Sequence, residues 1–222
     1  MELNILIVDD HPLLIDAYIN LISCTVDKYK LNFLKSTNAK DAYNIIKLNH
    51  IENNNIDLAI FDISIPEYKE KYIYDGSDLA IKFQNKFPSS KIIIITMHDE
   101  GCLLSKIFNK IEPDGFLNKS DINFDTFSVT ISKILENEVI ISKTIIEALK
   151  KFNELKYKFD DIDYEIIRLL EKGIKTKNLP PIIGLTLSAI EKRKKNIRFH
   201  LLNGKNGKDL DIVKKAKSLK FI

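Results

Sequence analysis

The sequence contains few of the features that are typical of secreted proteins, membrane proteins or proteins stabilised by a structural metal ion. Its two cysteines, Cys24 and Cys102, have neither CxxC spacing nor a histidine cluster nearby, so packed, reduced thiols are favoured over a disulfide or a zinc site. No apolar run reaches the roughly 18 residues needed to span a bilayer. The N-terminus also lacks the basic start and long apolar middle of a signal peptide. We therefore expect a cytoplasmic protein with no membrane partner.

Common catalytic motifs are absent as well. The chain has no Walker-type loop, GxSxG elbow or HExxH pair, and its four histidines show no ligand spacing. The sequence gives no support to nucleotide hydrolysis, serine-hydrolase chemistry or zinc proteolysis.

Arginine is missing from the first 150 residues, and charge is divided unevenly along the chain. Residues 1–150 carry 16 Lys against 22 Asp plus Glu, a net charge of −6, whereas residues 151–222 carry 18 Lys plus Arg against 9 Asp plus Glu, a net charge of +9. At 222 residues the chain is long enough for two small domains. The asymmetry suggests an acidic domain joined to a basic domain that meets a polyanion.

The first 137 residues alternate short apolar runs with longer amphipathic stretches. This pattern predicts an α/β domain, a doubly wound, five-stranded parallel sheet with helices on both faces. The expected strands are Asn4–Val8, Leu31–Lys35, Asp57–Phe61, Lys91–Thr96 and Gly115–Leu117. The expected helices are Leu13–Val26, Ala39–Ile51, Ser77–Phe87, Glu100–Ile111 and Ile122–Leu135.

From residue 138 onward the strand signal disappears, and a small all-α domain is expected. Residues 138–158 read as a linker with a helix at Ser142–Phe152 followed by a charged segment, and residues 159–222 as the domain itself. Glycines lie between the helical stretches, as expected for short turns between helices. The expected helices are Asp160–Lys172, Leu179–Ile183, Thr186–Leu201 and Lys208–Ser218.

Polar residues follow the predicted strands of the first domain. Asp9 and Asp10 follow the first strand, Asp62 the third, and Lys119 comes shortly after the fifth, while Thr96 ends the fourth. In an open α/β sheet the carboxyl ends of the strands meet at one rim, where ligands bind. Three carboxylates so close together favour a cation among them, and all-oxygen ligands suit Mg²⁺. A carboxylate beside Mg²⁺ can attack a phosphoryl donor, with a lysine and a hydroxyl neutralising the phosphoryl oxygens.

Each of these polar residues alone has an ordinary structural explanation, such as a turn or a helix cap. Their occurrence together, at the ends of four predicted strands, is not explained in that way. The segments NILIVDDHP, DLAIFDISIP, IIIITMHDE and GFLNKSD resemble the flavodoxin-like receiver domains of two-component response regulators over roughly residues 2–137. The resemblance implies the following roles: Asp62 as phosphoacceptor, Asp9, Asp10, Asp62 and the Ser64 backbone carbonyl as Mg²⁺ ligands, Thr96 as switch hydroxyl, Lys119 as phosphate-binding lysine and Phe116 as switch aromatic.

The segment from Glu67 to Asp75 departs from the receiver pattern. It enlarges the loop after Asp62 and places Tyr68, Tyr72 and Tyr74 in it. We expect a surface insertion rather than a partner-recognition element. Phe116 lacks a tyrosine hydroxyl, so its switching would depend on packing alone.

The most basic segment lies in the second half. YEIIRLLEKGIKTKNL, LTLSAIEKRKKNIRFHL and DLDIVKKAKSLKFI resemble, in order, the parts of the LuxR-type helix-turn-helix of NarL/FixJ regulators. The resemblance implies a recognition helix at Thr186–His200 that enters the major groove of double-stranded DNA, and a closing helix at Lys208–Ser218 that dimerises. The DNA contacts it implies are Thr186, Ser188, Lys192, Arg193, Lys195 and Asn196.

Two residue choices differ from that helix-turn-helix pattern. Pro180-Pro181 falls in the scaffold helix, which should start late or be distorted because proline clashes with the preceding turn. Glu191 stands where the family often has lysine, and its carboxylate repels phosphate but can accept a hydrogen bond from cytosine N4.

The leading hypothesis is a transcriptional regulator, not an enzyme, that accepts phosphate on Asp62 from a sensor histidine kinase and binds DNA as a homodimer. One alternative keeps the receiver but makes the C-terminal half a protein-interaction or dimerisation module. Another is an aspartyl-phosphate phosphatase of the haloacid dehalogenase type, but Asp9-Asp10-His11-Pro12 does not supply the DxDx[TV] arrangement of that family.

Overall fold

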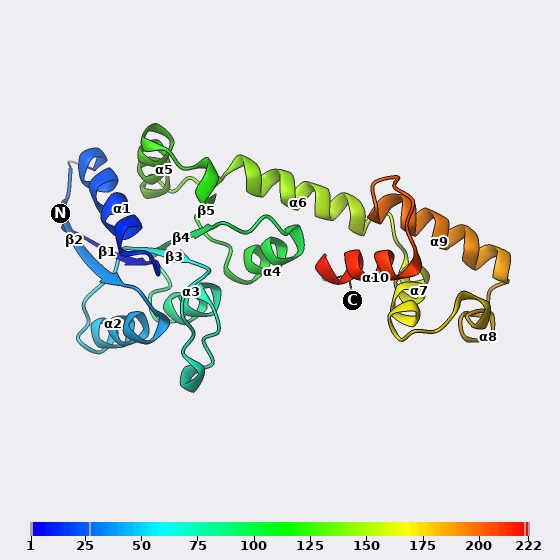
Figure 1. Cartoon of the computed structure of the whole chain (residues 1–222). Coiled ribbons are helices and arrows are strands. Elements are labelled where there is room, and N and C mark those ends of the chain that lie inside the picture. Colours follow the sequence, from blue (N-terminus) through cyan, green and yellow to red (C-terminus); the bar gives the residue numbers. More distant parts are fainter. Residues whose placement is uncertain (1, 27, 220, 222) are drawn as a thin grey trace. The chain divides into compact units, whose positions relative to one another are not determined.

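The structure is a computed structural model that describes residues 2–26, 28–219 and 221. Residues 1, 27, 220 and 222 lie outside the described residues. The chain forms two compact units, each with its own hydrophobic core (Figure 1). The first unit comprises Met1–Asp99 and Leu104–Ile146, and the second Glu100–Leu103 and Glu147–Ile222.

The first unit is built on a parallel sheet with the strand order β2-β1-β3-β4-β5-β6. The strands are β1 (Glu2–Val8), β2 (Lys30–Ser36), β3 (Leu58–Asp62), β4 (Lys91–Thr96), β5 (Gly115–Asn118) and β6 (Ile140–Ile141). The predicted five strands are all present, and the two-residue β6 extends the sheet beyond β5. A strand this short gives no alternation or apolar run that a sequence pattern could register.

Helices cover both faces of this sheet. The helices are α1 (Pro12–Thr25), α2 (Ala39–Ile51), α3 (Gly76–Gln84), α4 (Gly101–Ile111) and α5 (Phe124–Leu135). Figure 1 shows α1 and α5 together on one face, with α2 and α3 on the other. The doubly wound α/β fold predicted from the sequence is confirmed.

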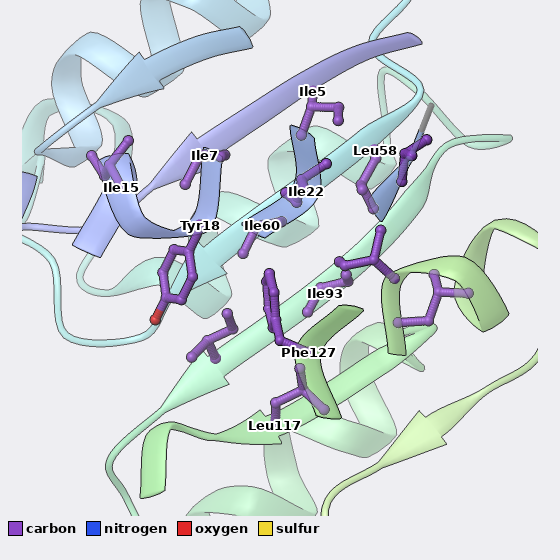
Figure 2. Close-up of a cluster of buried hydrophobic side chains, with 14 of the residues drawn as sticks. Ile5, Ile7, Ile15, Tyr18, Ile22, Leu58, Ile60, Ile93, Leu117 and Phe127 are labelled. Carbon is purple, nitrogen blue, oxygen red and sulfur yellow. The ribbon is translucent and has the colours of Figure 1, made fainter. Parts of the chain in front are cut away.

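The core between the sheet and the α1–α5 pair is made of branched aliphatic side chains. Figure 2 shows Ile7, Ile60 and Ile93 from neighbouring strands facing Ile22 of α1 and Phe127 of α5. The period of two in β1 and β3 sends alternate residues to this face. Burial of apolar area is the main stabilising term of such a core, at roughly 25 cal/mol per Å², and it holds the strand ends in register.

The loop between β3 and α3 carries the expected insertion. It contains the short 3-10 helix η1 (Lys69–Lys71) and is closed by hydrogen bonds between Tyr68 and Ile73 in both directions. Ile73 is fully buried, and Tyr68 packs edge-on against Tyr43, whereas Tyr72 and Tyr74 are exposed. The insertion is therefore an ordered surface loop whose base is fixed by the pairing of Tyr68 with Ile73.

The insertion ends where α3 returns to the end of β3. Asp75 caps α3 by accepting hydrogen bonds from the backbone N–H groups of Ser77 and Asp78. Gly76 donates its N–H to the carbonyl oxygen of Ile63 at 2.9 Å. A Cβ on Gly76 would lie 1.8 Å from the carbonyl oxygen of Asp62, so only glycine permits this approach.

The second unit is helical. It contains most of α6 (Lys143–Lys156), α7 (Asp161–Glu171), the 3-10 helix η3 (Thr176–Asn178), α8 (Pro180–Ile183), α9 (Leu187–Leu201) and α10 (Asp209–Ser218). Ile166, Ile190, Ile197 and Ile212 meet in its core. The predicted small all-α arrangement is confirmed.

The length of α6 differs from the prediction, and the prolines of α8 have the effect that the sequence predicts. α6 runs to Lys156, so most of the segment predicted as a charged linker is helical. Lys, Glu and Leu are good helix formers, and no Gly or Pro interrupts them. Pro180 and Pro181 occupy the first positions of α8, where no backbone donor is needed, so the scaffold helix does start late.

Candidate functional site

The rim formed by the carboxyl ends of the parallel strands brings the predicted acidic residues together. The register pairs Val8 with Phe61 and Asp62 with Ile95, so the residues that follow β1 lie beside the end of β3. Asp9, Asp62 and Thr96 are 1%, 3% and 0% exposed. The rim is therefore a buried polar site rather than a solvated turn.

Lys119 links the two buried carboxylates. Its Nζ donates to Oδ2 of Asp9 and to Oδ2 of Asp62, both at 2.8 Å. Lys119 begins the 3-10 helix η2 (Lys119–Asp121), which Asn118 caps by accepting from the N–H of Ser120. The cap fixes the direction in which the lysine leaves the sheet, and the ammonium neutralises part of the acidic charge.

The charges of this group depend on one another. Burial raises the pKa of Asp62, and the hydrogen bond and charge of Lys119 oppose that rise without cancelling it. Burial acts to lower the pKa of Lys119, but its bonds to Asp62 and Asp9 outweigh burial, and the pKa is raised. Lys119 therefore stays protonated throughout the neutral range and keeps a positive charge beside the two carboxylates.

Asp62 has one carboxylate oxygen free for chemistry. Its Oδ1 is buried and has no hydrogen-bond partner among the described residues. A buried acceptor without a partner costs free energy, so such atoms call for a functional explanation. Oδ1 is suited either to ligate a cation or to attack an electrophile.

Asp10 and His11 lie at the mouth of the site. Nδ1 of His11 is 2.7 Å from Oδ1 of Asp10 and 3.3 Å from Oδ1 of Asp9, and the His11 N–H donates to Asp9 at 2.9 Å. Together the three residues could offer ligand atoms to one ion. Carboxylate oxygens of Asp9, Asp10 and Asp62 fit a hard divalent cation such as Mg²⁺, and Oδ1 of Asp62 has no hydrogen-bond partner in the described part of the chain.

The two predicted switch residues lie on neighbouring strands. Thr96 ends β4, and its Oγ1 accepts a hydrogen bond from the N–H of His98 at 2.9 Å. Phe116 on β5 is fully buried and stacks on Phe108 of α4, with 6.4 Å between ring centroids. The predicted metal ligand Ser64 follows β3, with its Oγ 3.4 Å from Nε2 of His98.

Sequence reasoning missed Asn118. This buried side chain donates to the carbonyl oxygen of His98 at 3.1 Å and accepts from Ser120, while its own N–H donates to Oγ of Ser142. It thus joins the loop after Thr96 to the turn that carries Lys119. Its position as the last residue of a strand at the same rim was the available signal.

The predicted recognition helix, α9, begins as expected. Thr186 is its N-cap and accepts from the N–H of Ala189 at 3.3 Å. Leu187 at the start of the helix is exposed, and the other exposed side chains form one face, which we call the outer face: Ser188, Glu191, Lys192, Lys195, Asn196 and Phe199. Four of the predicted DNA contacts belong to this face, and Thr186 is exposed beside it.

Arg193, the remaining predicted contact, is turned inward instead. Its Nη1 donates to Asp160, the N-cap of α7, at 2.8 Å and to the buried Asp163 in the first turn of that helix at 3.0 Å. Lys194 is buried and binds Asp209 at 2.7 Å. Much of the basic charge of α9 therefore stabilises the packing of helices, and periodicity alone could not reveal it because the acidic partners lie on other helices.

Comparison with known proteins decides the family. Residues 5–126 match the model of the Response regulator receiver domain family, which is more than half of the chain. The chain belongs to the response regulator receiver family. The matched segment contains the rim residues Asp9, Asp62, Thr96 and Lys119 of this response regulator.

Similar full-length proteins were also found. Transcriptional regulatory protein MctR from Rhizobium johnstonii is 20% identical over 205 residues, 90% of this response regulator and 87% of that protein. The RcsB response regulator of Salmonella typhimurium has a TM-score of 0.70 at 18% identity, covering 97% of this chain and 100% of that one. RcsB from Salmonella enterica serovar Typhimurium, bound to promoter rprA with the phosphomimetic BeF3−, has a TM-score of 0.61 at 19% identity, covering 98% and 100%. The likeness extends over both units.

Within residues 2–26, 28–219 and 221 of this response regulator, no helix is both long enough and apolar enough to cross a bilayer.

Proposed function

We propose that this response regulator is a DNA-binding transcriptional regulator whose activity is controlled by phosphorylation of Asp62. The observation that carries the proposal is the buried carboxylate of Asp62, with Oδ2 held by Lys119 and Oδ1 without a hydrogen-bond partner among the residues that the structure describes. The named relatives support it, since one is a transcriptional regulatory protein and another is bound to a promoter.

The chemistry follows from the placement of these atoms. A carboxylate oxygen of Asp62 attacks the phosphorus of a phosphohistidine on a sensor kinase or of an acyl phosphate. A P–O bond to Asp62 forms, the bond to the donor's imidazole or carboxylate breaks, and the leaving group takes that electron pair. Lys119 and Thr96 then bind phosphoryl oxygens. The receiver thus modifies itself and has no separate substrate to turn over.

Asp9, Asp10, Asp62 and the Ser64 carbonyl would hold Mg²⁺. The ion would supply charge neutralisation between the carboxylates and the incoming phosphoryl oxygens. What the chain itself contributes is a set of oxygen donors fixed at the ends of two strands, and a lysine that remains charged.

We assign DNA binding to the second unit. The outer face of α9 presents Ser188, Lys192, Lys195 and Asn196, all side chains that can donate hydrogen bonds to base edges or phosphates. We propose that this face enters the major groove of double-stranded DNA, with two copies of the chain bound as a homodimer.

DNA binding is tested by electrophoretic mobility shift. The full-length protein is incubated with a pool of randomised duplex DNA, with and without acetyl phosphate and Mg²⁺, at several salt concentrations. We expect phosphorylation to change the affinity, and the affinity to fall steeply with salt because several phosphates are neutralised. Absence of binding in both states would favour a C-terminal protein-interaction module instead.

A further inference from the structure

A cavity of about 530 Å³ lies in the second unit beside the outer face of α9. Its walls come from the C-terminal half of α9 and from the turn that follows, and they include Lys195, Arg198, Phe199, Lys205 and Asn206. We call it the basic cavity. No residue of the turn was among the predicted DNA contacts.

The turn is folded tightly against the helix. Asn203 and Gly204 adopt left-handed backbone conformations, with φ of 52° and 77°. Gly204 donates its N–H to the carbonyl oxygen of Phe199 at 2.8 Å, which reverses the chain direction. This reversal brings Lys205 and Asn206 back beside α9, so the cavity is part of the fold rather than a chance gap between mobile side chains.

The walls carry an excess of positive charge. Lys194 and Arg198 approach the same carboxylate, that of Asp209, at 2.7 and 3.6 Å. Within the described part of the chain, Lys195 and Lys205 have no such acidic partner, and Nε of Arg198 is buried without a hydrogen-bond partner. Among the described residues that line the wall, Glu191 alone is acidic. The cavity thus offers an anion two exposed lysines, Lys195 and Lys205, that have no acidic partner among the described residues.

We infer that the basic cavity binds a backbone phosphate of the DNA, an assignment that rests on the proposed function. Lys195 belongs both to the cavity wall and to the outer face, so a duplex lying along that face would bring a phosphodiester to the cavity. Arg198 and Lys205 then donate to the phosphate oxygens. Such a contact fixes the register of the helix on the duplex and carries no sequence information itself.

The experiment compares Lys205→Gln with Lys172→Gln, a variant of an exposed lysine at the end of α7 that matches it in charge change. DNA affinity is measured across a range of salt concentrations. For Lys205→Gln we expect weaker binding to all sequences, and a slope of log K against log salt that is smaller in magnitude by about 0.9, the value for one phosphate contact. Lys172→Gln should retain the wild-type slope.

The outcomes separate this inference from the proposed function. If the wild type binds no DNA, the proposed function fails. If the wild type binds and the two variants have equal slopes, the phosphate assignment is overturned. Titration with inorganic phosphate, followed by NMR shifts at Lys205 and Asn206, provides a second probe. A site for free anions alone would lose phosphate binding in Lys205→Gln while DNA binding stayed at the wild-type level, and this result would also overturn the assignment.

A different observation, in the first unit, concerns the start of α6. The carboxylate of Asp121 accepts hydrogen bonds from the N–H of Thr144 at 2.9 Å and from its hydroxyl at 2.8 Å. Ser142 also hydrogen-bonds to Asp121, and its Oγ accepts from the N–H of Asn118. We call Asp121, Ser142 and Thr144 the α6 anchor.

The anchor is two residues from the phosphate-binding lysine. Lys119 and Asp121 are the first and last residues of η2, a single rigid turn. Burial acts to raise the pKa of Asp121, but the bonds from Ser142 and Thr144 outweigh it and the pKa is lowered, so the anchoring carboxylate is charged. We propose that a movement of Lys119 on phosphorylation is transmitted through Asp121 to the first turn of α6, the helix that leads into the second unit. This also rests on the proposed function.

Hydrogen–deuterium exchange tests the anchor without DNA. Full-length wild type, Asp121→Asn, Thr144→Val and the control Asp125→Asn are compared with and without beryllofluoride and Mg²⁺. In the wild type and the control we expect the phosphoryl mimic to change exchange in residues 143–150. In both anchor variants that change should be lost while the change around Asp62 persists.

Each other outcome has a separate meaning. No response around Asp62 in the wild type would count against the proposed function. A response of residues 143–150 that is equal in all four proteins, or absent from the wild type, would overturn the role of the anchor. Thr144→Val removes only a hydroxyl, so it remains informative even if Asp121→Asn fails to fold.

Discussion

Full-length protein incubated with acetyl phosphate and Mg²⁺ should gain the mass of one phosphoryl group, and the Asp62→Asn variant should gain none. The asparagine keeps the shape of the side chain and can still contact Lys119, but its amide lacks the anionic oxygen that attacks phosphorus. The buried Oδ1 of Asp62, which has no partner among the described residues, is the atom this substitution removes from the chemistry. Intact-mass spectrometry measures the result directly.

The matched control for that experiment is Asp125→Asn. Asp125 is an exposed carboxylate in the first turn of α5, away from the strand ends, and its loss should leave phosphorylation at the wild-type level. Phosphorylation of Asp62→Asn to the same extent as wild type would show that another residue is the acceptor.

The Gly76→Ala variant should be strongly destabilised. The new Cβ would lie 1.8 Å from the carbonyl oxygen and 2.8 Å from the carbonyl carbon of Asp62. These are backbone atoms of a central strand, which cannot rotate aside as a side chain can. Overpacking in well-packed regions costs roughly 1–3 kcal/mol and occasionally more, and a contact with backbone belongs at the upper end. Urea unfolding measures the loss.

Gly207→Ala is a suitable comparison for this substitution. A Cβ there would meet first Cδ1 of Leu202, the end of a flexible side chain, at 2.5 Å. Its effect on the free energy of unfolding should therefore be smaller. Equal destabilisation of the two variants would show that the contact with the Asp62 backbone costs no more than the contact with the Leu202 side chain. We also expect residual folded Gly76→Ala to be phosphorylated more slowly, because the shift must move the backbone of Asp62.

Much of the first unit could be predicted because its apolar pattern is continuous. The run Ile92–Ile95 predicts β4 with its observed bounds, and the amphipathic stretch Ala39–Ile51 predicts α2 with its observed bounds. The structure adds that Asn38 caps α2. The convergence of Asp9, Asp62 and Lys119 followed from parallel topology, since the strand ends of such a sheet share one edge.

What the sequence did not reveal depends on contacts between distant residues. Lys194 lies on the same helical stripe as Ile190 and Ile197, yet a lysine at such a position is usually read as solvated. Its burial depends on Asp209, which α10 supplies. The inward turn of Arg193 likewise depends on the capping acids of α7. Pairings of this kind require the tertiary fold.

The base of the β3–α3 insertion has a practical consequence. The loop is closed at its base by the hydrogen bonds between Tyr68 and Ile73, and Ile73 is buried, while the tip at Lys69–Lys71 is exposed. Extra length at that tip would be absorbed outside the packed region, because the entropy of closing a loop grows slowly with length. The tip is therefore a natural place to graft a reporter peptide, since added residues there would lie outside the closed base of the loop.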